Sequence, residues 1–174
     1  IEKGDMPTDM SENGIKMWFL DRIRPNLILP FTEIDENESS NITKQVYTLL
    51  HSISHALINE ASEICGLDKS SLSEYILPNI PAVFIYCSNS QGFNMGALYS
   101  AFQTQFDKWL KRACERVKKC IFDPVCINKE KACAGCLFLN EVSCRHFNKD
   151  LDRSYLCGYF DNQKQRKLKG YWEI

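Results

Sequence analysis

Five cysteines lie within 25 residues of one another in the C-terminal third of the chain, and two of them form a Cys-x-x-Cys pair. They are Cys120, Cys126, Cys133, Cys136 and Cys144. Two thiolates separated by two residues can bind one ion from a single tight turn, and Zn²⁺ favours a tetrahedral set of sulfur ligands. The sequence therefore predicts a structural zinc site on four of these five cysteines. Cys120 is the expected spare, because the other four lie closer together in the chain.

Disulfide bonds are the alternative use of these thiols. The chain has nine cysteines, an odd number, so at least one thiol stays unpaired within a monomer. The first ten residues are acidic and polar, unlike a secretory signal, and clustered cysteine pairs in intracellular proteins more often bind metal. We therefore expect a cytoplasmic zinc-binding protein. The remaining cysteines stand alone in apolar runs and are expected to be small buried residues; they are Cys65, Cys87, Cys114 and Cys157.

His51 and His55 lie four residues apart in a stretch with helical periodicity, so their rings share one face. This spacing could place two metal ligands side by side. The metalloprotease pattern His-Glu-x-x-His is not met, however, because a Ser-Ile-Ser run stands between them. The same face carries apolar side chains, which favours histidines packed against the core. The alternative is a metal-dependent hydrolase or nuclease that uses both histidines and an acid such as Glu60.

The segment 108–119 carries six basic residues and a single acid, Glu115. The basic residues are Lys108, Lys111, Arg112, Arg116, Lys118 and Lys119. Residues 108–174 hold 15 Lys and Arg against 8 Asp and Glu, whereas residues 1–107 hold 6 against 14. A basic helix end with an interleaved tryptophan is typical of a surface that contacts a nucleic-acid backbone, and we predict this role, with DNA as the expected partner. The alternative is a solvated helix face with cations near its C-terminus.

The sequence contains no pattern for nucleotide hydrolysis or acyl transfer. Residues 88–96 link an apolar strand to a helix, where an anion could bind. The glycines of this loop, Gly92 and Gly96, match neither the dinucleotide-binding pattern nor the Walker pattern, and a tight turn explains them better. A Gly-x-Ser-x-Gly elbow is also absent. We therefore predict no catalytic residues and no ATP hydrolysis by this chain alone.

Apolar periodicity predicts two long helices and several short elements. Steps of three and four residues predict a helix from Ser40 or Asn41 to Gly66 and a second one over 98–117. Ser71 to Glu74 has capping-box spacing and predicts a short helix. Residues 82–87 form a continuous apolar run that predicts a buried central strand.

We expect four parts in the chain: N-terminal strands at 14–20 and 27–29 with an acidic linker (1–40), a helix–strand–helix core (41–119), a Cys-rich zinc module (120–160) and a basic tail (161–174). The length of 174 residues and an apolar fraction of 44% suit one domain with a metal-bound appendage. No apolar run approaches the ~18 residues that cross a membrane. The predicted class is α/β or α+β, with a small central sheet, two long helices and a C-terminal four-cysteine zinc module. Because the first residue is Ile, we also expect a piece of a longer protein.

Several segments resemble a known family. They read L-L-H-S-I-S-H-A-L-I, then I-Y-C-S-N-S-Q-G-F-N-M-G-A-L, then the five-cysteine run, then N-K-D-L-D-R. This order is similar to the MrfA zinc-binding domain (MZB domain), found in MrfA-type DNA-repair helicases and in the DrmB subunit of the DISARM anti-phage system. The combined pattern Asp123-Pro124-x-Cys126, Cys133-x-x-Cys136 and Glu141-x-x-Cys144 is most similar to the DrmB-like branch.

The resemblance implies bound Zn²⁺ and a role beside the lobes or subunit of a superfamily 2 helicase. The chain lacks those lobes, so their ATPase activity is not implied. It departs from the family at Ala134 and Gly135, where a histidine often stands, and in a loop at 92–96 with fewer glycines. Supporting roles are expected for His51, His55, Asn148, Asp152 and Arg153, of which the last two could orient the cysteine loops by hydrogen bonds.

The expected function is that of a zinc-binding accessory domain in a helicase-associated DNA-repair or anti-phage defence protein. It would bind nucleic acid or a partner and would not itself be catalytic. A pure protein–protein scaffold, whose acidic half docks a partner subunit, is a further alternative beside the hydrolase or nuclease.

Overall fold

The computed structural model describes residues 11, 13–14, 17, 41–78, 80–89, 96–161 and 165–173. The elements in chain order are helix α2 (Asn41–Cys65), the 3₁₀ turn η2 (Lys69–Ser71), strands β1 (Leu72–Leu77) and β2 (Ala82–Cys87), helix α3 (Ala97–Val117), the π-helical turn η3 (Cys126–Glu130), helix α4 (Ser154–Cys157), and strands β3 (Tyr159–Asp161) and β4 (Arg166–Leu168). Helices and small antiparallel sheets are separate along the chain, so the class is α+β, one of the two predicted. No helix in these ranges is long and apolar enough to span a membrane.

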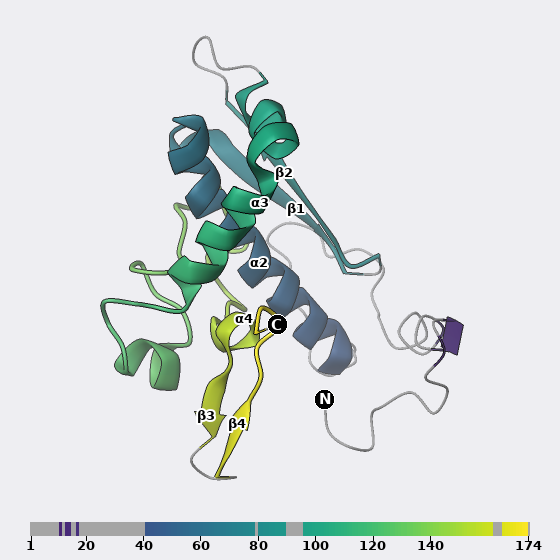
Figure 1. The fold of residues 1–174 in the computed structure, drawn as a ribbon, viewed down its shortest axis with the longest axis vertical. Helices are drawn as coiled ribbons and strands as arrows, with labels where there is room; N and C mark the ends of the chain where they lie inside the picture. The colour runs from purple at the N-terminus through teal and green to yellow at the C-terminus, as the bar shows by residue number, and fades with distance from the viewer. Residues whose placement is uncertain are drawn as a thin grey trace.

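Helix α2 is the central element of the fold. It contacts α3, both strands of the first hairpin and α4 (Figure 1). Its apolar stripe is buried, with Tyr47, Ile58 and Ala61 at most 1% exposed, as the periodicity predicted. The helix ends before Gly66, whose φ of +64° lies in the left-handed region that favours glycine just past a helix end. The predicted helix and its end are both confirmed.

Helix α3 packs across α2 through small and aromatic side chains. Ala113 and Val117 are fully buried, and Trp109 inserts between the helices, where its indole N–H donates to the Leu57 carbonyl over 2.8 Å. A buried indole needs such a partner because its N–H would otherwise lose its hydrogen bond to water. The predicted second helix is therefore confirmed.

Strands β1 and β2 form an antiparallel hairpin, with Leu72 opposite Cys87 and Leu77 opposite Ala82. The short helix predicted from Ser71 is wrong, because this segment pairs with β2 and its Glu74 side chain turns into the core instead of capping a helix. The strand predicted at 82–87 is confirmed. It is not a buried central strand, however, because among the described strands it pairs with β1 alone and its side chains are half-buried or exposed.

The C-terminal part is joined to the helices through a shared core. One hydrophobic cluster contains Ala113 and Val117 of α3, Cys126 and Cys136 of the cysteine loops, and Leu156 of α4. The segment predicted as a basic tail contains β4 and only the last residue of β3; the two strands form the hairpin at the bottom of Figure 1. The division of the chain into four parts stays a prediction.

The N-terminal predictions lie almost entirely outside the described residues. The strand at 27–29 and the acidic linker up to residue 40 are not described. Of the strand predicted at 14–20, only Gly14 and Met17 are described, and both are helical.

Candidate metal centre

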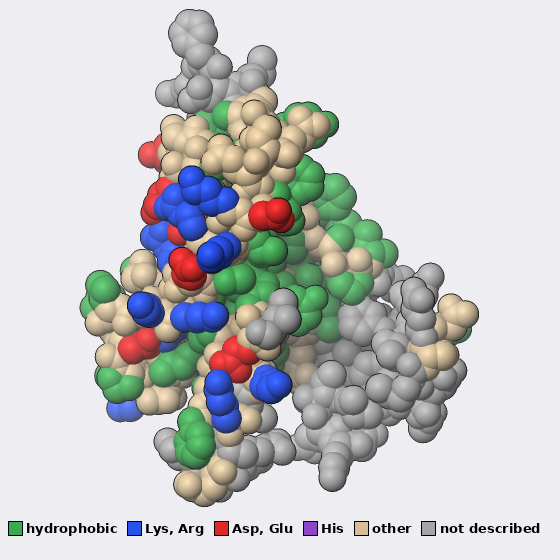
Figure 2. Space-filling view, viewed as in Figure 1, with side chains coloured by type: hydrophobic (Ala, Val, Ile, Leu, Met, Phe, Trp, Pro, Cys, Tyr) green, Lys and Arg blue, Asp and Glu red, His purple; other side chains and the backbone are tan. Residues whose placement is uncertain are grey.

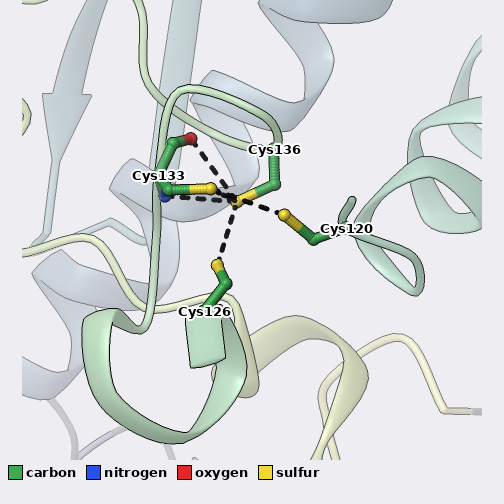
Figure 3. Close-up of side chains that lie close together, drawn as sticks. All are labelled: Cys120, Cys126, Cys133 and Cys136. Atoms are coloured by element: carbon green, nitrogen blue, oxygen red, sulfur yellow. Dashed lines mark hydrogen bonds between the residues drawn. The ribbon is translucent and has the colours of Figure 1, made fainter. Parts of the chain in front are cut away.

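Four cysteine sulfurs converge in the loops that follow α3. The ligand atoms of Cys120, Cys126, Cys133 and Cys136 lie within 4.8 Å of one another, and their side chains point to a common centre (Figure 3). The sulfur–sulfur distances are 3.7 Å for Cys126–Cys136, 3.7 Å for Cys133–Cys136 and 3.4 Å for Cys120–Cys133. Sulfurs at the Zn–S bond length around a tetrahedral zinc ion are about 3.8 Å apart, whereas a disulfide needs about 2.0 Å. The four residues therefore fit a metal ion and are free thiols in this geometry.

Backbone turns place each sulfur at this centre. Cys120 follows the C-terminal end of α3, Cys126 begins η3, and Cys133 and Cys136 belong to one tight turn in which the Cys133 N–H lies 3.3 Å from the Cys136 sulfur. Gly135 lies within this turn. A Cβ added there would be 3.1 Å from the Phe122 ring, closer than ordinary contacts, so glycine lets the two loops approach each other.

The thiols differ in how readily they ionise. Burial raises the pKa of Cys126, and it raises the pKa of Cys136 to about 11. At Cys133 burial also opposes ionisation, but hydrogen bonds from Cys120 and the Gly135 amide outweigh it and lower the pKa. A metal binds thiolates, so binding would release protons from the buried thiols. The centre therefore suits a cation that replaces these protons.

Arg153 contacts both the end of α3 and the first cysteine loop. It is 1% exposed, and its guanidinium donates to the Val117 carbonyl over 3.1 Å and forms an ion pair with Asp123. The other carboxylate oxygen of Asp123 accepts from the Cys120 N–H over 3.1 Å. The orienting role of Arg153 stays a prediction, and these contacts favour it.

Asp152 anchors the same segment to α2. Its N–H donates to the Ser52 hydroxyl over 3.0 Å, and its carboxylate accepts from the Ser154 N–H over 2.9 Å. Its orienting role stays a prediction, and its contacts are those of a residue that fixes the start of α4.

Cys144 lies apart from the other four cysteines. The expectation that Cys120 is the spare differs from the structure, because Cys120 joins the cluster at the end of α3 while the sulfur of Cys144 lies 3.3 Å from Nε2 of His51. Asn148 closes the loop around Cys144: its side-chain amide donates to the Leu139 carbonyl over 2.8 Å, and its own N–H lies 3.4 Å from the Cys144 sulfur. Spacing along the chain could not show which loop the fifth cysteine joins.

His51 and His55 are fully buried on the inner face of α2, as expected for histidines that face the core. The acid beside them is Glu74 of β1, whose Oε1 lies 3.1 Å from both Nε2 atoms. Glu60, the acid named for the hydrolase alternative, is not the acid beside the histidines, because it accepts a hydrogen bond from Arg116 of α3 and forms an ion pair with Arg112. Sequence reasoning missed Glu74. The signal was a carboxylate inside the otherwise uncharged run Leu-Ser-Glu-Tyr-Ile-Leu.

The basic residues of the segment 108–119 divide into two groups. Arg112 and Arg116 form ion pairs of 2.6–3.0 Å with Glu60 and Glu63 and so fasten α3 to α2. The lysines are exposed at the surface, where basic side chains gather with some acidic ones among them (Figure 2); they are Lys108, Lys111, Lys118 and Lys119. Only the lysines are therefore fully available to a nucleic acid.

Comparisons with known proteins identify the class of this domain. Residues 53–137 match the family model described as the MrfA Zn-binding domain. The match includes all four clustered cysteines and ends before Cys144. Residues 53–137 are therefore similar to a zinc-binding domain of the MrfA type, and the predicted resemblance is confirmed.

A curated relative supports the DrmB-like assignment. The DISARM protein DrmB of Bacillus paralicheniformis is 29% identical over 140 residues, which cover 72% of this chain and 25% of that protein. The chain thus spans about a quarter of the length of this relative.

Proposed function

We propose that this chain is a zinc-stabilised accessory domain of an anti-phage defence protein. The observation that carries the proposal is the convergence of Cys120, Cys126, Cys133 and Cys136 within 4.8 Å, inside the segment that matches a Zn-binding domain. Four protein sulfurs fill a tetrahedral shell and leave no position for a substrate, which is typical of a structural zinc ion. The similarity to a DISARM protein supports the defence context.

The zinc ion would stabilise a part of the chain that has little regular secondary structure of its own. Between α3 and α4 the chain runs through turns and loops, and several of its buried residues, among them Cys126, Cys136 and Leu137, share one core cluster with both helices. A metal that joins the end of α3 to the Cys133–Cys136 turn would therefore hold these loops against the helices. Folding of this module would depend on the metal.

We further propose that the exposed lysines of α3 contact a DNA backbone. The test compares Lys108→Glu/Lys111→Glu with a control of equal charge change on η3 and β4, Lys129→Glu/Lys167→Glu. Each lost phosphate contact lowers the slope of log K against log salt by about 0.9. We expect the α3 variant to lose affinity for duplex DNA and nearly two units of slope, and the control to lose far less. Equal losses in the two variants would exclude a specific contact at α3.

A protein-binding role has its own supporting observation. A cavity of about 410 Å³ opens beside α3, and its lining includes Phe84, Tyr99 and Phe102, of which Phe102 is 52% exposed. Figure 2 shows hydrophobic side chains gathered on the same face as the basic ones. Exposed aromatic side chains around a groove are typical of protein-binding surfaces. The occupant that we propose is an apolar segment of a helicase subunit or helicase lobe in the same assembly.

Co-elution with that helicase in gel filtration tests this second role. Phe102→Ser should weaken co-elution, whereas Ile121→Ser, an exposed apolar residue on the cysteine loops, should not. Unchanged co-elution of the Phe102 variant would remove the groove as the docking site.

A further inference from the structure

A second set of metal-type ligands lies in the core and shares no residue with the four-cysteine site. His51 and His55 come from α2, Glu74 comes from β1, and Cys144 comes from the loop after residue 137. Their ligand atoms lie within 4.8 Å of one another, and none of the four residues is more than 5% exposed. We propose that these residues bind a second Zn²⁺ ion in a closed site of two histidines, one glutamate and one cysteine. The proposal does not depend on the function proposed above.

The distances between these atoms fit one tetrahedral ion. Nε2 of His51 and Nε2 of His55 each lie 3.1 Å from Oε1 of Glu74, and Nε2 of His51 lies 3.3 Å from the Cys144 sulfur. Around a tetrahedral zinc, a nitrogen and an oxygen ligand are about 3.4 Å apart, and a nitrogen and a sulfur are about 3.6 Å apart. The side chains therefore need to move by only a few tenths of an ångström to bind zinc.

The orientation of His55 is that of a metal ligand. Its Nδ1 lies 2.9 Å from the Leu137 carbonyl oxygen. Because a carbonyl oxygen can only accept, Nδ1 carries the hydrogen, and a neutral ring then presents the lone pair of Nε2 to Glu74. Two lone pairs that face each other at 3.1 Å repel unless a cation lies between them. A backbone carbonyl that fixes the tautomer in this way is one of the common partners of a metal-bound histidine.

Hydrogen bonds without a metal explain the positions of these four side chains less well. Without a metal, both rings would have to donate to the single oxygen Oε1 of Glu74, so His55 would carry a hydrogen on both ring nitrogens, with its ring centroid 4.4 Å from that of His51. Meanwhile Oε2 of Glu74 and the Tyr47 hydroxyl are buried and have no hydrogen-bond partner among the described residues. A hydrogen-bonded network in a protein core uses both carboxylate oxygens.

A zinc ion would also balance the negative charges in this part of the core. One thiolate and one carboxylate together neutralise a divalent cation, and the two imidazoles remain neutral. Buried charges are tolerated when they are paired or coordinate a metal. The neighbouring backbone positions these ligands: the Ser73 hydroxyl donates to the Ser143 carbonyl over 3.1 Å, and so places Glu74 and Cys144 side by side.

The second ion would fasten β1 and the Cys144 loop to α2. All four positions of the tetrahedron are taken by protein atoms, and the site is closed to solvent, so its role is structural. This reading replaces the hydrolase alternative, because no open position remains for water or substrate. It also gives Cys144 a function outside the four-cysteine cluster.

The test is zinc content per chain and the zinc X-ray absorption spectrum of the purified protein, after gel filtration with a weak chelator. For the wild-type protein we expect two zinc ions, with an average of about 2.5 sulfur and 1.5 nitrogen or oxygen neighbours each. Cys144→Ser should retain one zinc ion with four sulfur neighbours. The control variants Cys157→Ser and His146→Gln lie outside the four ligands and should keep two.

One zinc ion per wild-type chain with sulfur neighbours only would overturn the proposal. Two ions in Cys144→Ser with an unchanged spectrum would also overturn it. If Cys144→Ser fails to fold, the wild-type spectrum alone decides, because a single four-cysteine site has no nitrogen or oxygen neighbours. Failure of the four-cysteine site would appear separately, as a wild-type spectrum that lacks a sulfur-only component.

Discussion

Replacing Arg153 with methionine tests how the protein supports its four-cysteine site. The guanidinium is buried, donates to the Val117 carbonyl at the end of α3, and pairs with Asp123, which in turn accepts from the Cys120 N–H. Methionine fills much of the same volume without a charge or a donor. The substitution therefore removes the polar support and leaves most of the packing.

The expected loss in the free energy of unfolding depends on which polar groups lose their partner. Breaking a buried ion pair by removing one partner costs about 3–5 kcal/mol, and this includes the carbonyl of Val117 that loses its donor. The Asp123 side chain is 31% exposed, so water can solvate it, and the lower end of the range applies. We expect Arg153→Met to lower the free energy of unfolding by about 3 kcal/mol. Arg153→Lys keeps the charge but loses the planar fork of donors and should cost about half as much.

Urea unfolding at saturating zinc measures this free energy, and transfer of zinc to a coloured chelator measures metal release. Arg153→Met should also release zinc faster, because Asp123 no longer holds Cys120 in place. The control is Arg145→Met, since Arg145 is exposed and such surface changes stay within about 0.5 kcal/mol. If Arg153→Met stays within that range and releases zinc at the wild-type rate, the supporting role of Arg153 is refuted.

Three further predictions concern the contact between α2 and α3. Glu60→Ala removes a carboxylate that is only 4% exposed and pairs with two arginines; those arginines can regain water, so urea unfolding should show a loss of about 2 kcal/mol. A hydrogen bond from Arg116 lowers the pKa of Glu63, so the stability it adds is present at neutral pH and is lost as pH falls below the ordinary carboxyl value of about 4.3. The stability difference between wild type and Glu63→Gln should shrink accordingly in an acid titration. Trp109→Phe leaves the Leu57 carbonyl without its 2.8 Å donor and should cost about 2 kcal/mol in the same urea assay.

Controls on α3 separate these contacts from general surface effects. Glu115 is exposed on the same helix, and Glu115→Ala should change stability by less than about 0.5 kcal/mol. A loss from Glu60→Ala no greater than this would show that the ion pairs do not fasten the helices. A difference between wild type and Glu63→Gln that stays constant down to pH 3 would contradict the assigned pKa effect. For Trp109→Phe, wild-type stability would mean that the indole hydrogen bond adds nothing.

The two long helices could be predicted because their apolar residues follow the helical repeat. Gly66 marked the end of α2, since a left-handed residue past a helix end is usually glycine. Strand β1 was missed because its structure comes from pairing with β2 and from burial of Glu74, and neither is visible in a local pattern. The capping-box spacing at 71–74 favours a helix locally, but pairing of this segment with β2 outweighs that preference.

The type of the candidate site could be predicted from the sequence more readily than the residues that form it. Cysteine spacing indicated a metal site, but the path of the chain after α3 decides that Cys120 joins the cluster. In the same way, the spacing of His51 and His55 indicated a shared face. Their neighbours Glu74 and Cys144 come from distant segments, and only the fold brings them together.

Zinc content of Cys136→Ser against Cys157→Ser is the most direct measurement of the central claim. Cys136 lies in the four-cysteine cluster, whereas Cys157 lies outside both ligand sets. We predict that Cys136→Ser loses one zinc ion per chain relative to wild type and loses the fold of the loops between α3 and α4, while Cys157→Ser keeps the full zinc content. A Cys136→Ser protein with wild-type zinc content would contradict a four-cysteine zinc site.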